Sequence, residues 1–111
     1  MREALSGYPE RAERVRELVV EAWALAAEAC RSSCARGVCE ELVEDALGAA
    51  MDEAEEAVRL PGPWLSIPHV AEAARRLREA AERLREAGCR EEAGLLEEAA
   101  RRLSMADALG G

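Results

Sequence analysis

Apolar residues recur every three or four positions along most of the chain, which is the spacing of one face of an α-helix. Four segments carry this pattern and predict helices at about residues 9–34, 38–60, 67–87 and 90–108. Strand signals are nearly absent, because the helix formers Ala, Leu, Glu and Arg dominate. The stripe of the third segment is the most regular and consists of Val70, Ala73, Leu77, Ala80, Leu84 and Ala87.

Proline, glycine and serine mark the predicted helix ends. Pro9 suits a first helical position, and Gly37 suits a left-handed stop after the first helix. Pro61 is expected to end the second helix, because proline lacks the backbone N–H that would continue it. Ser66 is placed to cap the third helix and Gly88 to end it.

Four helices of similar length with two tight connections predict an all-α fold, an antiparallel up-down four-helix bundle. At 111 residues, the chain 1–111 is expected to form a single helical-bundle domain. In this topology the turns at 35–38 and 88–89 lie at one end of the bundle. The loop at 61–66 lies at the other end, together with both chain termini.

Alanine dominates the apolar half of the sequence, with 24 Ala and only three aromatic residues. Alanine stripes let helices approach closely but bury little apolar area, so each stabilises the bundle weakly. A homodimer, or a complex with another protein partner, is therefore expected. Val20, Trp23 and Ala27 lie partly off the main stripe of the first helix and are the candidates for that interface.

The net charge of the chain bears on whether its partner could be a nucleic acid. The chain has 15 Arg, no Lys and 23 acidic residues, a net charge of −8, which makes general binding to nucleic acid improbable. In the last two predicted helices, Arg and Glu also lie three or four residues apart, which predicts ion pairs within each helix. No apolar run approaches the roughly 18 residues that would span a bilayer. With no secretory signal in the sequence, a cytoplasmic location without membrane attachment is expected.

Five residue types (Phe, Lys, Asn, Gln and Thr) are absent, and Val outnumbers Ile seven to one. This composition is typical of a GC-rich genome. The missing amides also fit a thermophile, because Asn and Gln are thermolabile. A de novo designed helical bundle built from a reduced alphabet would have a similar composition.

Four cysteines are expected to gather at one end of the bundle, namely Cys30, Cys34, Cys39 and Cys89. Disulfides are the favoured interpretation, with Cys34–Cys39 closing the first turn and Cys30–Cys89 joining the two hairpins. A Cys30–Cys34 bond within one helix is disfavoured by geometry. Free buried thiols remain an alternative, as does a four-thiolate site for zinc or an iron–sulfur cluster, although the spacing lacks the usual C-x2-C pairs.

Tyr8, Trp64 and His69 are expected at the opposite end and are the binding candidates. Trp64 either plugs the open end of the bundle or offers an exposed aromatic ring to a partner. His69 is the single histidine and the one candidate for a catalytic residue. No nucleophile pairs with it in the sequence, and the thiols lie at the other end, so the chain is not expected to be an enzyme.

The order of features over residues 10–84 resembles that of HEPN-type helical domains, archaeal relatives included. Those domains pair an N-terminal helix and a Gly-containing turn with an Ala-rich second helix, a Pro-containing loop and a His that begins the third helix. The matching positions are Gly37, then Ala46, Ala49, Ala50, Ala54 and Ala57, then 61–68, then His69. The resemblance implies a dimer that associates with RNA or nucleotides.

The ribonucleases among HEPN-type domains carry an Arg, four to six intervening residues and a His. Here nine residues separate His69 from the nearest upstream arginine, Arg59, so the catalytic arginine is missing. The sequence therefore favours a non-catalytic helical interaction or accessory protein. The alternatives are a HEPN-like nucleotide- or RNA-associated domain, a metal-binding bundle with a four-cysteine site, and a designed bundle.

Overall fold

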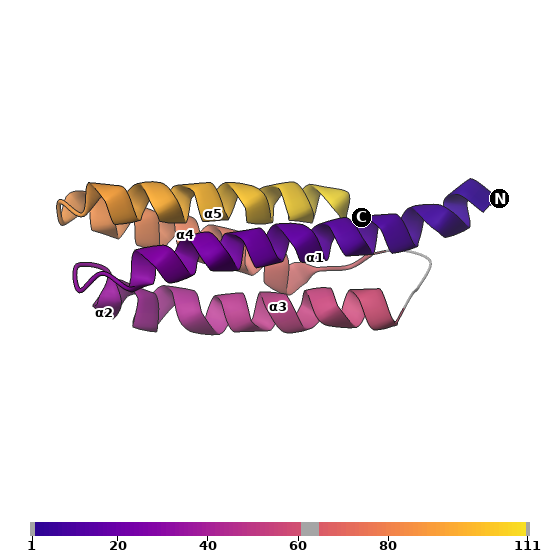
Figure 1. Cartoon of the computed structure of the whole chain (residues 1–111), viewed down its shortest axis with the longest axis horizontal. Coiled ribbons are helices and arrows are strands. Elements are labelled where there is room, and N and C mark those ends of the chain that lie inside the picture. The colour runs from indigo at the N-terminus through magenta and orange to yellow at the C-terminus, as the bar shows by residue number, and fades with distance from the viewer. Residues whose placement is uncertain (1, 61–64, 111) are drawn as a thin grey trace.

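The computed structural model describes residues 2–60 and 65–110, with side chains from Gly7 onward in those ranges. Over these residues the chain forms helices and no strand. The elements are α1 (Arg2–Cys30), α2 (Arg36–Val38), the π-helical turn η1 (Cys39–Val43), α3 (Glu44–Arg59), α4 (Pro68–Glu86) and α5 (Arg90–Leu109). Because α2, η1 and α3 follow one another without a break, they make one rod, and the described chain has four such rods (Figure 1).

The four rods run alternately up and down and lie side by side, so the predicted all-α up-down bundle is confirmed (Figure 1). α5 packs closely against both α1 and α4, whereas α3 packs less closely against the same two neighbours. The molecule measures 52 × 18 × 17 Å. Its length follows from α1, whose first turns project beyond the ends of α3 and α5 (Figure 1).

Leucine and alanine from all four rods form one buried cluster. The predicted stripes supply most of it, although Ala87 is exposed because α4 ends at Glu86. No charged residue is buried among the described residues, and Tyr8 is the buried one whose side chain carries a hydroxyl. The largest fully buried side chains are leucines, namely Leu18, Leu65, Leu77, Leu84, Leu96 and Leu103. These six leucines therefore provide much of the bulk in a core that is otherwise rich in alanine.

Two predicted features of the first helix are wrong. α1 begins at Arg2, and Pro9 lies inside it rather than at its first position. The helix continues through the lost backbone hydrogen bond because the preceding residue, Tyr8, is buried against the bundle, at 7% exposure. α1 also ends at Cys30 instead of residue 34, and Gly37 does not stop it, because Gly37 lies within α2.

Gly88 is confirmed as the residue that ends the third predicted helix. Its φ of 88° is the one positive φ among the described residues, and L side chains adopt that conformation rarely. The backbone N–H groups of Gly88 and Cys89 donate to carbonyls of the last turn of α4, at 3.1 and 2.8 Å. This left-handed residue lets the chain reverse within three positions and enter α5 at Arg90.

Replacing Gly88 by Ala is expected to lower the free energy of unfolding by about 1 kcal/mol, because a Cβ disfavours the left-handed conformation. Gly48→Ala is the matched control. Gly48 lies in the second turn of α3 with no heavy atom within 4 Å of an added Cβ, so alanine there should stabilise the helix by about 0.5–1 kcal/mol. Urea unfolding of both variants measures the two changes, and a stabilised Gly88→Ala protein would contradict the argument.

The predicted ion pairs form along the helix surfaces. Within α4, Glu72 pairs with both Arg75 and Arg76. The hydrogen bond from Arg76, and after it that from Arg75, holds the pKa of Glu72 below its usual value. Their contribution to stability is therefore present at neutral pH and is lost as the pH falls through that lowered pKa. Between rods, Arg102 of α5 contacts Glu21 of α1 at 3.0 Å. Exposed pairs of this kind contribute little individually.

Among the described residues, none of the helices is both long enough and apolar enough to cross a membrane.

Candidate functional site

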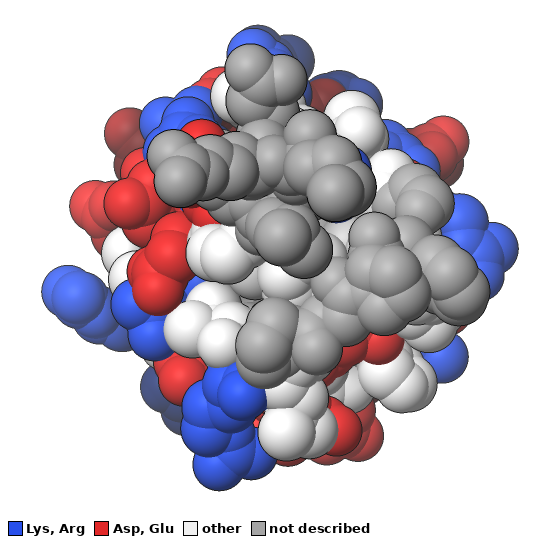
Figure 2. All heavy atoms as spheres, turned by 90° about the vertical axis from the view of Figure 1, so that its right-hand side faces the viewer, with Lys and Arg blue, Asp and Glu red and all other residues white. Residues whose placement is uncertain are grey.

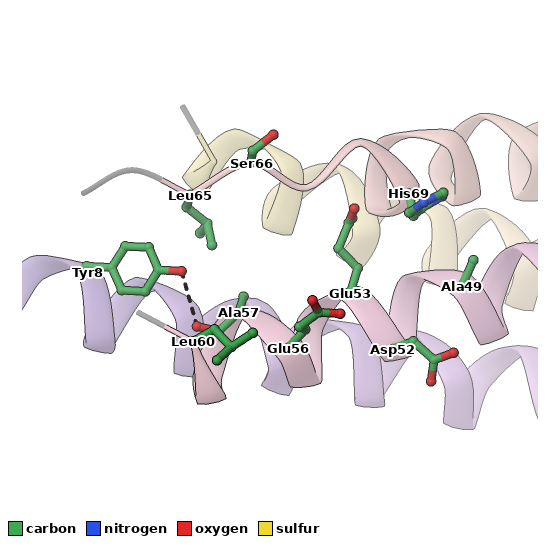
Figure 3. A pocket seen from close by; sticks show the side chains of 10 residues that line it. All are labelled: Tyr8, Ala49, Asp52, Glu53, Glu56, Ala57, Leu60, Leu65, Ser66 and His69. Atoms are coloured by element: carbon green, nitrogen blue, oxygen red, sulfur yellow. Dashed lines mark hydrogen bonds between the residues drawn. The ribbon is translucent and has the colours of Figure 1, made fainter. Parts of the chain in front are cut away.

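A cleft of about 510 Å³ opens between α3 and the start of α4, at the end of the bundle where the 61–66 loop was expected (Figure 3). Two of the three predicted binding residues, Tyr8 and His69, line it. Trp64, the third, lies outside the described residues. The remaining lining residues are Ala49, Asp52, Glu53, Glu56, Ala57, Leu60, Leu65 and Ser66.

Tyr8 has a structural role in this cleft. Its hydroxyl donates a hydrogen bond to the carbonyl oxygen of Ala57 at 3.1 Å, which Figure 3 marks with a dashed line. Ala57 lies in the last turn of α3, where carbonyl oxygens lack a partner within the helix. The buried tyrosine therefore caps α3 and ties it to α1.

Glu53 caps the start of α4 from across the cleft. Its Oε1 atom accepts a hydrogen bond from the backbone N–H of Val70, the third residue of α4, at 3.0 Å. The predicted cap, Ser66, makes no such bond, and Ile67 precedes the helix without a side-chain cap. Glu53 reaches the helix from α3, so no local sequence motif marks it. The sequence alone therefore does not predict this cap.

Replacing Glu53 by Ala is expected to lower the free energy of unfolding by about 1 kcal/mol, the usual loss when a helix cap is removed. Glu53→Gln should lose less, because the amide oxygen still accepts the hydrogen bond from Val70. Glu56→Ala is the control from the same helix and the same cleft, and it should leave stability nearly unchanged. Thermal unfolding by circular dichroism checks the order of the three, and an equal loss in Glu53→Ala and Glu56→Ala would contradict it.

His69 is exposed at the second position of α4, on the side of the cleft that faces α3. Ser66 lines the same cleft, but the two side chains lie apart in Figure 3 and no hydrogen bond joins them among the described residues. A serine nucleophile needs a base within hydrogen-bond reach, so this pair has no catalytic geometry in the structure.

Three carboxylates, those of Asp52, Glu53 and Glu56, give the cleft an acidic character. No arginine is among its described lining residues, so the cleft attracts cations and repels phosphate groups. Around the part of this end that the structure describes, acidic and basic side chains are mixed (Figure 2).

The opposite end holds all four cysteines in two disulfides. Cys30 bonds to Cys39, with their Cα atoms 5.8 Å apart, and Cys34 bonds to Cys89, with Cα atoms 6.2 Å apart. The prediction of disulfides is confirmed, but both proposed pairings, Cys34–Cys39 and Cys30–Cys89, are wrong. Because α1 ends at Cys30, residues 31–35 fold back and bring Cys39 of η1 against Cys30. Cys34, within that turn, instead meets the turn that precedes α5.

Glu92 lies beside the Cys34–Cys89 bridge. One of its carboxylate oxygens and the Sγ atoms of Cys34 and Cys89 lie within 4.8 Å of one another. The Ser32 hydroxyl donates a hydrogen bond to this carboxylate and is the largest cause of its lowered pKa. The backbone N–H of Glu92 itself also donates to the carboxylate and lowers the pKa further. The Cys30–Cys39 sulfurs are not part of this group, so the structure does not gather four thiols around one point.

An apolar groove of about 170 Å³ runs between α1 and the η1–α3 rod. Trp23 forms one wall and is 45% exposed, and Val20, one turn earlier, is 49% exposed. Ala27 is exposed as well, so the fold leaves exposed all three residues that were predicted to form an interface. The other lining residues are Ala26, Cys30, Val43, Glu44 and Leu47.

Comparison of the chain with protein-family models, curated proteins and solved structures gives no match in any of the three. The HEPN-type resemblance therefore stays a prediction.

Proposed function

We propose that this chain is a non-catalytic interaction protein that acts as a homodimer through the apolar face of α1, defined here as Val20, Trp23 and Ala27 with the adjoining groove. The observation that carries the proposal is the half-exposed Trp23 beside an apolar groove. Buried tryptophans at the centre of an interface contribute strongly to binding, and an exposed apolar patch, as opposed to a single exposed side chain, indicates an interaction surface.

A second copy of the chain is the occupant that fits this face. The same surface carries both a projecting ring, Trp23, and an apolar hollow lined by Val43 and Leu47. A two-fold axis that crosses α1 near Trp23 would place each ring against the hollow of the partner, as an isologous interface requires. Because the alanine-rich core stabilises the fold only weakly, burial of this additional apolar area in a dimer would add to the stability of the chain.

Light scattering at micromolar concentration is expected to give twice the monomer mass for the wild-type chain. Replacing Val20 by Glu and Trp23 by Ala together should give the monomer mass, because a charge then lies in the middle of the apolar face. Leu60→Glu is the control, since Leu60 is equally apolar and 63% exposed but lies at the end of α3. A monomeric wild-type chain, or a monomeric Leu60→Glu chain, would count against the proposed interface.

A HEPN-like association with nucleotides has less support. The exposed His69 at the start of α4 favours it, whereas the carboxylates of the same cleft disfavour phosphate binding. Nucleotide that co-purifies with the wild-type chain and is lost on His69→Ala would favour this alternative.

The two disulfides also bear on location. We infer that the chain works either in a non-reducing compartment or in the cytoplasm of a hyperthermophile, where intracellular disulfides persist. Alkylation of free thiols in intact producing cells, followed by intact-mass analysis, distinguishes bridged from reduced chains.

A further inference from the structure

We propose that Cys34, Cys89 and Glu92 form a zinc site when the Cys34–Cys89 bridge is reduced, so that metal binding and this disulfide are alternative states of the same atoms. The inference is independent of the proposed dimer, because it concerns the turns at the end of the bundle rather than the face of α1.

The three candidate ligand atoms already lie within the space that a zinc ion needs. Two Zn–S bonds of about 2.3 Å at the tetrahedral angle place the sulfurs about 3.8 Å apart, and a Zn–O bond of about 2.0 Å places the carboxylate oxygen about 3.5 Å from each sulfur. The two Sγ atoms and the Glu92 oxygen lie within 4.8 Å of one another in the bridged state. The sulfurs therefore need to separate only to ligand spacing once the bond between them is broken.

The rest of the fold holds these ligands in place without that bond. Cys89 directly precedes α5, and Glu92 lies in the first turn of the same helix. Cys34 lies in the turn 31–35, where its backbone N–H donates a hydrogen bond to the Ser32 hydroxyl at 3.2 Å. The Ser32 hydroxyl orients the Glu92 carboxylate, as outer partners of metal ligands commonly do.

The two disulfides differ in their access to a reductant. Cys34 is exposed, whereas Cys39 is 2% exposed and Cys30 is half-buried. Thiol–disulfide exchange requires a thiolate to reach one sulfur of the bond. The Cys34–Cys89 bridge is therefore expected to be reduced first.

The proposed step uses a dithiol as the reductant. One thiolate of the dithiol attacks the Cys34 sulfur, the Cys34–Cys89 bond breaks, and Cys89 leaves as a thiolate. The second thiol of the reductant then closes its own disulfide and releases Cys34, so two electrons pass from the dithiol to the two cysteines. Zn²⁺ next binds both sulfurs as thiolates, displacing their protons, together with the Glu92 carboxylate. Water completes the four-coordinate shell at the exposed side of Cys34.

In the test, the full chain is reduced with a phosphine, the phosphine is removed by desalting without oxygen, and Zn²⁺ is then added. We expect about one zinc per chain in the reduced protein and none above background in the oxidised protein. Co²⁺ in place of Zn²⁺ should give the thiolate-to-cobalt charge-transfer band in the reduced protein alone. A reduced wild-type chain that retains no zinc overturns the proposal.

Three variants assign the ligands. Cys30→Ser with Cys39→Ser should still retain one zinc after reduction, whereas Cys34→Ser with Cys89→Ser should retain none. Glu92→Gln keeps both disulfides and should bind zinc at least about tenfold more weakly, with an altered cobalt spectrum. Loss of zinc in both double-serine variants would instead indicate a four-thiolate site, and unchanged affinity in Glu92→Gln would remove the carboxylate from the site. Either result overturns the proposal, and Glu92→Gln decides it if a double-serine variant does not fold.

Discussion

Replacing both Cys34 and Cys89 by Ser is expected to lower the free energy of unfolding by about 4 kcal/mol. The bridge joins residues that are 55 positions apart, so its removal frees a long loop in the unfolded chain. The chain-entropy relation gives about 4 kcal/mol for a loop of that length. Within the native state, the same bridge ties the turn after α1 to the turn before α5.

Replacing Cys30 and Cys39 by Ser is the matched comparison. Their bridge spans 9 positions, for which the same relation gives about 2.7 kcal/mol. Urea unfolding of the two double variants, each checked by intact mass, measures the difference. The wild-type mass should rise by about 4 Da on reduction and that of each variant by about 2 Da, because each disulfide takes up two hydrogens. A larger loss from the short bridge than from the long one would contradict the loop argument.

Replacing Leu77 by Ala is expected to lower the free energy of unfolding by about 3–4 kcal/mol, towards the upper part of the range for buried leucines. Leu77 is fully buried near the middle of α4. The buried cluster that contains Leu77 includes many alanines, whose short side chains have little freedom to fill a cavity. The removed volume is therefore expected to persist as a cavity.

Leu60→Ala is the control for this prediction, because Leu60 is 63% exposed and just past the end of α3. Its replacement should change the free energy of unfolding by less than about 0.5 kcal/mol. Chemical denaturation of both variants gives the comparison. A loss below about 1 kcal/mol for Leu77→Ala would show that the core closes around the missing side chain.

The helical periodicity was sufficient to predict the bundle. In α4, Val70, Leu77 and Leu84 are seven residues apart and are all buried, because a seven-residue step returns a side chain to nearly the same face of a helix. Gly88 could also be predicted, since a glycine directly after a regular stripe is the usual left-handed stop. Both features depend only on residues that are close in the sequence.

The features that the sequence did not predict depend on contacts between distant segments. The cysteine pairing changes completely when α1 ends four residues early, because that shift decides which sulfur faces Cys39. The Glu53 cap on α4 comes from another helix, and the passage of α1 through Pro9 is accompanied by the contact of Tyr8 with α3. Local propensities carry no information about these partners, so only the packed structure shows them.

The two ends of the bundle are closed by bonds of very different strength. Two covalent bridges fasten the cysteine end, whereas single hydrogen bonds from Tyr8 and to Glu53 join the helices at the cleft end. Local opening of a protein begins where the least free energy is needed. Backbone amides in the last turn of α3 and the first turns of α4 should therefore exchange with solvent through partial openings, while those beside the bridges exchange only when the whole chain unfolds. The bundle would then behave as a clamp that is hinged at its cysteines and opens at the cleft.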